Sequence, residues 1–456
     1  MRRMLARAAV LGLAPTLLIT ACTASRTATG PVVSVSSALA PPESSSGAPA
    51  PAVAPAPSTS AAVTPSAVPS TAPSAAAVPS TGTPSVARSS PRPSATAAKS
   101  GASKPATASP SPSGSTAGRV TSPGAMVLDK TIMGHLNEKS IVASGTGLFF
   151  AQNMMYLHTI NVYDSAYHLV KIIPDAVNLA SLGYPQYPGT YKGAPVEAAF
   201  TPDHKYAYVS NYSMYGAAPF TREGSDSCSL ADHYPDSFVY RIKVATLSID
   251  QVIEVGAVPK FVAVTPNGKY VLVSNWCSYN ESIIDTGSGK VVTTIPIGPY
   301  PRGIAVDPVS GTAYVAEMGS NKIAAINLQT FEVSWINAVG SAPRHLVMSA
   351  DGHWLYATLN NDGDVAKISM VTRTVVARVR TGSAPRSMTI SPDGSYIYVV
   401  NYMSNTMSKV RTSDTHVVQT VPTNPNPIGI TYDAASHRIW VACYSGSIMV
   451  FRDATA

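Results

Sequence analysis

The stretch GSAPRSMTISPDGSYIYVVN, residues 382–401, decides the fold of this chain. A Gly/Pro junction that ends at Pro385 leads into an apolar run, which stops at the turn Ser391-Pro-Asp-Gly394. A second run, rich in Tyr, Ile and Val, follows and ends at Asn401. Short runs of Val, Ile, Tyr and Thr between Pro, Asp and Gly turns are typical of strands joined by tight hairpins.

This pattern returns at a constant interval. Prolines at the equivalent position are spaced by 42 residues, at Pro259, Pro301, Pro343, Pro385 and Pro427. Third and fourth strands are predicted near 406–410 and 417–421, so each interval holds four strands. A fixed period of this size indicates a repeat architecture, and four antiparallel strands in about 42 residues are typical of one propeller blade.

Alignment of the copies predicts seven blades. The units begin at Asn137, Pro195, Pro259, Pro301, Pro343, Pro385 and Pro427. The last unit ends soon after its third strand, at 447–451, so its outer strand must come from elsewhere. Residues 126–133 match the fourth-strand pattern and are predicted to close the ring, which removes an open sheet edge. We therefore expect an all-β, seven-bladed β-propeller over residues 126–456.

Two segments precede the repeats. Residues 1–21 combine Arg2, Arg3 and Arg7 with an apolar run that is too short to span a bilayer, which predicts a secretory signal. The end of this segment, Ile19-Thr-Ala-Cys22, resembles the lipobox of bacterial lipoproteins. That resemblance implies lipidation at Cys22 and an exported protein anchored to the outer face of the cell membrane. The alternative is an ordinary cleaved signal with a cysteine there by chance.

Residues 22–125 consist almost wholly of Ala, Ser, Thr and Pro. Such a composition cannot bury enough apolar surface to order a chain, so we expect a disordered tether, which would also accept O-glycosylation. Nine of the 32 basic residues lie before residue 126, together with only one of the 25 acidic residues. This leaves 23 basic and 24 acidic residues in the repeats. The net charge of +7 thus belongs to the leader and the tether, and nucleic acid is not an expected partner.

The second strand of each unit carries a family resemblance. Tyr208-Val-Ser-Asn211, Leu272-Val-Ser-Asn275, Tyr314-Val-Ala-Glu317 and Tyr398-Val-Val-Asn401 are similar to the repeats of YVTN-type β-propeller proteins. The resemblance covers roughly residues 126–451. It implies the lactonase-like propeller superfamily, which includes cell-surface proteins, lactonases and modules of redox enzymes. It therefore predicts architecture rather than activity, because function must be argued from a site.

Two departures from the period mark one face of the ring. The first unit carries an excess of 16 residues near 175–191, and the second an excess of 22 near 213–234. Both excesses fall on loops that emerge beside the repeat-proline junctions, whereas the Pro-Asp-Gly hairpins emerge on the opposite face. Binding specificity usually resides in such loops on a rigid scaffold.

The position after the repeat proline begins the innermost strand and should face the central channel. Four successive units place a cation there: Lys260, Arg302, Arg344 and Arg386. Arginine suits fork-like recognition of carboxylate or phosphate, so we expect these residues to bind an anionic small molecule, glycan or protein partner. Three asparagines at strand ends near this face join the candidates: Asn211, Asn275 and Asn401. Alternatively, each cation pairs with backbone or acid of a neighbouring blade.

The remaining cysteines are odd in number if Cys22 is lipidated. Cys228 lies in the larger insertion and Cys277 in the corresponding loop of the third unit, so a disulfide between them is a candidate. Cys443 stands at a strand end, where we expect a buried free thiol.

Catalytic motifs are absent from the sequence, including haem-attachment, zinc-protease, nucleophile-elbow and phosphate-loop patterns. No cofactor and no metal site are expected, because the acidic residues of the larger insertion read as a solvated loop rather than a calcium site. We therefore interpret the chain as a monomeric binding or scaffolding module. The alternative is a lactonase-like hydrolase at the same channel mouth, for which Glu317 and His345 are the candidate acid/base residues.

Overall fold

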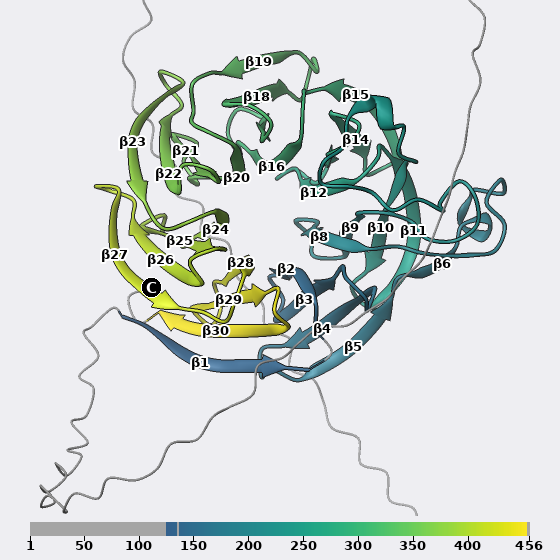
Figure 1. The fold of residues 1–456 in the computed structure, drawn as a ribbon, viewed down its shortest axis with the longest axis horizontal. Coiled ribbons are helices and arrows are strands. Elements are labelled where there is room, and N and C mark those ends of the chain that lie inside the picture. The colour runs from purple at the N-terminus through teal and green to yellow at the C-terminus, as the bar shows by residue number, and fades with distance from the viewer. Residues whose placement is uncertain (1–124, 135, 454–456) are drawn as a thin grey trace, which may run out of the picture. The chain divides into compact units, whose positions relative to one another are not determined.

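The computed structural model describes residues 125–134 and 136–453, which form a ring of seven antiparallel sheets whose inner strands surround a common axis, here called the channel (Figure 1). The predicted seven-bladed propeller is confirmed. The predictions for the signal, Cys22 and the tether lie outside the described residues. Among the residues described, no helix has the length and hydropathy of a membrane span.

Each blade runs from an inner strand at the channel to an outer strand at the rim. Blade 1 consists of β2 (Glu138–Ala143), β3 (Leu148–Asn153), β4 (Thr159–Asp164) and β5 (Leu169–Pro174). Blade 2 consists of β8 (Pro195–Phe200), β9 (Tyr206–Asn211), β10 (Ser237–Lys243) and β11 (Ser248–Val255). Blade 3 consists of β12 (Pro259–Val264), β13 (Tyr270–Asn275), β14 (Asn280–Asp285) and β15 (Lys290–Pro296). Blade 4 consists of β16 (Pro301–Val306), β17 (Thr312–Glu317), β18 (Lys322–Asn327) and β19 (Val333–Ile336). Blade 5 consists of β20 (Pro343–Met348), β21 (Trp354–Leu359), β22 (Asp364–Ser369) and β23 (Thr374–Arg380). Blade 6 consists of β24 (Pro385–Ile390), β25 (Tyr396–Asn401), β26 (Thr406–Arg411) and β27 (His416–Pro422).

Blade 7 joins the two ends of the propeller. It consists of β28 (Pro427–Asp433), β29 (Arg438–Cys443), β30 (Ser447–Asp453) and, as its outer strand, β1 (Met126–Met133). β1 pairs antiparallel with β30, from Met126 opposite Asp453 to Met133 opposite Ser447. Figure 1 shows the first strand alongside the last. The predicted closure by the N-terminal strand is confirmed.

Burial explains the sequence pattern of the strands. The second strand of a blade, such as β25, is buried over five consecutive residues because neighbouring blades cover both of its faces. Such a strand reads as a continuous apolar run rather than an alternation. The outer strand β27 alternates between exposed and half-buried residues, since one face meets water.

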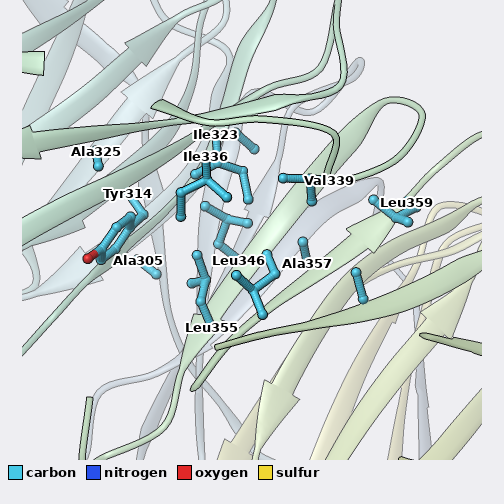
Figure 2. Packing of buried hydrophobic residues seen from close by; sticks show 13 residues of the cluster. Ala305, Tyr314, Ile323, Ala325, Ile336, Val339, Leu346, Leu355, Ala357 and Leu359 are labelled. Carbon is cyan, nitrogen blue, oxygen red and sulfur yellow. The ribbon is translucent and has the colours of Figure 1, made fainter. Parts of the chain in front are cut away.

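The core lies between blades rather than within one. The cluster between blades 4 and 5 shows the arrangement (Figure 2): Tyr314 and Ile323 of blade 4 pack against Leu346 and Leu355 of blade 5. Leu355 is fully buried, so truncation to Ala would cost about 2–5 kcal/mol through lost transfer energy and a cavity. This packing makes the ring a rigid frame for the loops at its two faces.

The two insertions contain most of the irregular structure. The first forms the hairpin β6 (Ala176–Asn178) and β7 (Thr190–Lys192), with the 3-10 helix η1 (Ala180–Leu182) between its strands. The second, between β9 and β10, contains the 3-10 helix η2 (Leu230–Asp232). Lys192 and Tyr215 exchange two backbone hydrogen bonds, so the two insertions contact each other on one face.

Candidate ligand site at the channel mouth

The inner strands begin with a β-bulge, and the bulge aims side chains at the channel. In β12, Pro259 pairs with Asn275 and Phe261 with Ser274, which leaves Lys260 as the extra residue. β24 repeats this arrangement and leaves Arg386 unpaired in the ladder. An extra residue in one strand bends it locally and re-aims its side chain, a device common next to functional sites.

The four predicted cations lie in this position but are not free surface charges. Lys260, Arg302 and Arg344 are between 3% and 7% exposed, and Arg386 is half-buried. Arg302 Nη1 donates to the carbonyl of Lys260 at 3.0 Å, and Arg344 Nη1 donates to the carbonyl of Arg386 at 2.6 Å. The alternative expectation, that the guanidinium groups bridge neighbouring blades, thus describes part of their contacts. A guanidinium has more N–H donors than one such bond uses, so both retain capacity for a ligand.

Lys139 and Glu197 join this set, although the sequence analysis did not select them. Lys139 is the extra residue of the bulge in β2, where Glu138 pairs with Asn153 and Ser140 with Gln152, so this blade begins one residue later than expected. Glu197 is the paired residue directly after the bulge in β8. Lys139 has its pKa lowered well below its usual range by burial and by the charges of Arg302 and Lys260. Burial raises the pKa of Glu197 to about 7, and the charge of Arg302 opposes this rise.

The larger insertion supplies a carboxylate to the same space. Asp226 forms an ion pair and hydrogen bond with Lys260, and its carboxylate remains 72% exposed. Burial would raise the pKa of Asp226, but the charge and hydrogen bond of Lys260 outweigh it and hold the pKa below the usual value. Burial lowers the pKa of Lys260 to about 7, although Asp226 opposes that change.

Aromatic rings lie above the cations. Lys260 Nζ lies 3.7 Å from the ring centroid of Trp276, and the Arg386 guanidinium lies 4.3 Å from that of Tyr402. In both blades the aromatic residue follows its cation by 16 positions. This fixed spacing is visible in the sequence and identifies the aromatic partner of each cation. Cation–π contacts of this kind contribute on the order of 0.5–2 kcal/mol and hold the cations in place.

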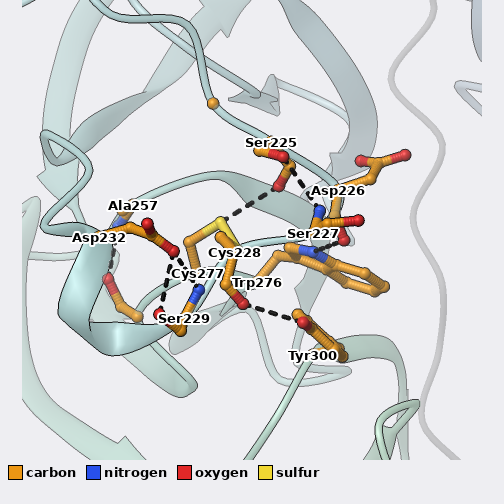
Figure 3. Close-up of a disulfide and its surroundings, with 12 residues drawn as sticks. Ser225, Asp226, Ser227, Cys228, Ser229, Asp232, Ala257, Trp276, Cys277 and Tyr300 are labelled. Carbon is orange, nitrogen blue, oxygen red and sulfur yellow. Dashed lines mark hydrogen bonds between the residues drawn. A yellow bond between two sulfur atoms is a disulfide. The ribbon is translucent and has the colours of Figure 1, made fainter.

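A disulfide between Cys228 and Cys277 anchors the insertion beside Trp276 (Figure 3), with the two Cα atoms 5.6 Å apart. Trp276 Nε1 donates to the backbone carbonyl of Asp226 at 3.2 Å, and the Tyr300 hydroxyl donates to the carbonyl of Cys228 at 2.9 Å. These contacts fix the backbone on both sides of the Asp226 carboxylate. The third cysteine, Cys443, is a buried free thiol, and burial raises its pKa to about 12.

The three asparagine candidates have a different role. Asn211, Asn275 and Asn401 are fully buried, and their amide groups donate hydrogen bonds within their own blades. Asn401 Nδ2, for example, donates to Ser408 Oγ at 3.1 Å. Their side chains therefore fasten the strand ends and do not reach the channel space, so we leave them out of the site.

The acid/base candidates are not brought together. Glu317 occupies the position of the buried asparagines and is 5% exposed, with its Oε1 against the backbone at Gly298. Within the described residues it forms no hydrogen bond or ion pair with His345. Burial and the charges of Arg344 and Arg302 lower the pKa of His345 to about 3, so the imidazole is neutral and weakly basic. No hydrogen bond or ion pair among the described residues therefore links the two candidates.

Metal-ligating groups show no cluster in residues 136–453: no three His, Cys, Asp or Glu side chains gather closely enough to hold an ion. The acidic residues of the larger insertion instead bind neighbouring protein groups. Asp232 caps η2 through Ser229, and Glu223 accepts a hydrogen bond from the Tyr215 hydroxyl at 3.0 Å.

The positive charge is poorly compensated in one part of the mouth. Burial lowers the pKa of Arg302 to about 10, and the nearby acids Glu197 and Asp226 oppose this change. For Arg344, burial and then repulsion by Arg302 and Arg386 lower the pKa well below its usual range. An anion placed beside these groups would relieve both the repulsion and the desolvation.

Comparisons with known proteins support the architecture. Residues 313–443, less than a third of the chain, match the family model "Cytochrome D1 heme domain". The solved structure of Kuenenia stuttgartiensis hydrazine synthase is similar, with a TM-score of 0.56 and 17% identity over 71% of this chain and 98% of that chain. No curated protein matches the chain. At this identity the structural likeness shows a β-propeller fold.

The family match raises the question of whether the site suits a haem. Axial haem ligands are His, Cys, Met or Tyr side chains, and His345 is the histidine of the matched segment that neighbours the arginines. A ligating histidine almost always donates its other ring N–H to a carboxylate, a carbonyl or water. Nδ1 of His345 is buried without such a partner among the described residues, and its ring packs edge-on against Phe261 at 5.2 Å. His345 therefore lacks the hydrogen-bonded ring that is typical of an axial haem ligand.

Proposed function

We propose that this chain is an exported, membrane-tethered β-propeller that binds an anionic ligand or partner at the mouth of its channel. Export and tethering are supported by the leader, by the lipobox-like segment ending at Cys22 and by the Ala/Ser/Thr/Pro-rich segment that follows. The binding role is supported by one observation above all: five basic side chains lie in the bulges at the starts of the inner strands, on the inserted face. They are Lys139, Lys260, Arg302, Arg344 and Arg386.

Preorganisation favours binding over chemistry at this site. Backbone carbonyls hold Arg302 and Arg344, and an aromatic ring covers Arg386, so little side-chain entropy is lost when an anion arrives. A hydrolase would in addition need a general acid or base in contact with the substrate, and no observation at His345 or Glu317 favours one.

The test is anion binding by the triple variant Arg302→Gln/Arg344→Gln/Arg386→Gln. Isothermal titration calorimetry with glucuronate, glucose 6-phosphate and citrate should show binding by the wild type and at least a tenfold loss in the variant. A matched control replaces three exposed arginines of blade 5, as Arg373→Gln/Arg378→Gln/Arg380→Gln, and should bind as the wild type does. Equal binding by both variants would remove the channel cations from consideration.

Haem binding is distinguished by spectroscopy. Titration of the purified chain with haem should give no absorbance change that depends on His345. A Soret shift that the His345→Ala variant loses would favour the haem alternative over the proposed function.

A further inference from the structure

The acids at the channel mouth come from one side of the ring. Glu197 lies in β8 of blade 2, and Asp226 lies in the insertion of the same blade. Of the acids, these two have the largest effects on the pKa values of Arg302 and Arg344. In a ring of seven, the junction between blades 5 and 6 lies opposite blade 2, and Arg344 and Arg386 belong to these two blades (Figure 1).

The loops above the mouth show the same asymmetry. Both insertions lie on blades 1 and 2, and the disulfide extends their cover to blade 3. Blades 5 and 6 have short turns instead, where β21 and β22 are joined by residues 360–363 and β25 and β26 by residues 402–405. The mouth is therefore covered on the acidic side and has no added loop on the side of Arg344 and Arg386.

Arg386 is also incompletely satisfied. Its Nε is buried without a hydrogen-bond partner among the described residues, and burial lowers its pKa. Most buried polar atoms in folded proteins are hydrogen-bonded, so an unpaired one at a candidate site points to a missing partner. The half-buried rings of Tyr402 and Tyr444, from adjacent blades, lie beside this position and could contact a ligand ring.

Asp226 supplies a negative charge of the protein itself on the side of the mouth that carries the insertions. Its carboxylate contacts Lys260, and its charge also acts on Lys139, Arg302, Arg344 and Arg386. The disulfide two residues away and the hydrogen bond from Trp276 hold it there (Figure 3). A ligand anion would therefore find this part of the mouth occupied by a negative charge of the protein itself.

We propose that the mouth holds two anion positions: Asp226 fills the one at Lys260, and the carboxylate or phosphate of a small ligand takes the one at Arg344 and Arg386. This inference rests on the proposed function and names the subsite and the ligand chemistry. Asp226 weakens ligand binding by a free energy that is proportional to the ligand's charge, because Coulomb energy scales with the product of the charges. The protein thus discriminates against more highly charged anions.

The test compares glucuronate, which carries one negative charge, with glucose 6-phosphate, which is close to doubly charged at pH 7.5, and uses glucose as the neutral control. The Asp226→Asn variant should bind glucuronate about fivefold more tightly than the wild type, and glucose 6-phosphate by roughly the square of that factor. Arg386→Gln should weaken binding of both ligands at least tenfold in either background. The control Glu223→Gln removes a carboxylate of the same insertion and should leave both affinities unchanged.

The outcomes distinguish a failure of the proposed function from a failure of the inference about Asp226. If the wild type binds neither charged sugar, the proposed function fails. If the wild type binds but Asp226→Asn binds equally or more weakly, Asp226 is part of the ligand site rather than its rival, and the inference is overturned. An equal gain for both ligands would also overturn it. Circular dichroism and the melting temperature of each variant show whether it folds, and Asp226→Ser provides a second replacement.

Discussion

The closure of the ring contains two ion pairs in very different surroundings, and their contrast gives a sharp prediction. Lys409 of β26 and Asp453 at the end of β30 lie 2.7 Å apart, and both are at most 1% exposed. Arg438 of β29 and Asp129 of β1 lie 2.8 Å apart, and both are 30% exposed. Breaking a buried pair typically costs about 3–5 kcal/mol, whereas an exposed pair contributes about 0–1 kcal/mol.

The perturbation is Asp453→Asn, which retains an acceptor for the Tyr398 hydroxyl but removes the charge that balances Lys409. The ring of Tyr396 lies 3.9 Å from Lys409 Nζ in the wild type, and this contact does not replace the lost negative charge. We therefore expect the free energy of unfolding to fall by about 3–5 kcal/mol. Asp129→Asn should lower it by about 1 kcal/mol or less.

Urea denaturation reports these changes through the fluorescence of Trp440, which stacks on Phe149 across the junction of blades 7 and 1 at 3.9 Å. The double variant Lys409→Met/Asp453→Asn should recover most of the loss, because it leaves no unbalanced buried charge. Equal losses for Asp453→Asn and Asp129→Asn, or no recovery in the double variant, would refute the reasoning.

Two further predictions concern stability. Replacing Cys228 and Cys277 by Ser should lower the free energy of unfolding by about 4 kcal/mol, the chain-entropy value for their separation of 49 residues, and a loss below about 1 kcal/mol in urea denaturation would contradict the bond's role. Burial raises the pKa of Glu138 to about 8, so the folded state holds a proton that the unfolded state releases near pH 4.3. Stability from this group is therefore present at low pH and is lost as the pH rises toward 8 and above. Glu138→Gln should match the wild type at pH 5 and exceed its unfolding free energy by a few kcal/mol at pH 9; a constant difference across this range would contradict the shift.

The fold could be predicted from the sequence because the repeat is strict. Blade boundaries follow from the spacing of the prolines, and the position of β1 follows from the missing fourth strand of the last unit. The insertions were located by subtraction from the period, and the structure shows that they touch through Lys192 and Tyr215. These features depend on local pattern and chain length, which one sequence contains.

The site was only partly predictable, because a bulge changes which side chain faces the channel. The position after the repeat proline finds Lys260 but not Lys139, which holds the same bulge position in a unit without that proline. It also misses Glu197, which follows the bulge of its strand. The three asparagines that the sequence offered as ligand-binding residues are a different case. They end their strands at the correct face, but full burial and hydrogen bonds inside the blades turn their amides away from the channel.

A symmetric scaffold alone cannot explain a directional site, since seven similar blades would surround the channel with seven similar environments. Direction arises where the copies differ. Blade 2 contributes the acids Glu197 and Asp226, whereas blades 5 and 6 contribute Arg344 and Arg386 without a covering insertion. The same departures from the repeat supply the disulfide that fixes Asp226 in place. Because rigid packing between blades holds these unlike segments at fixed distances, a charge introduced by one loop acts on cations across the mouth, and exchanging a single carboxylate should change which anions the protein accepts.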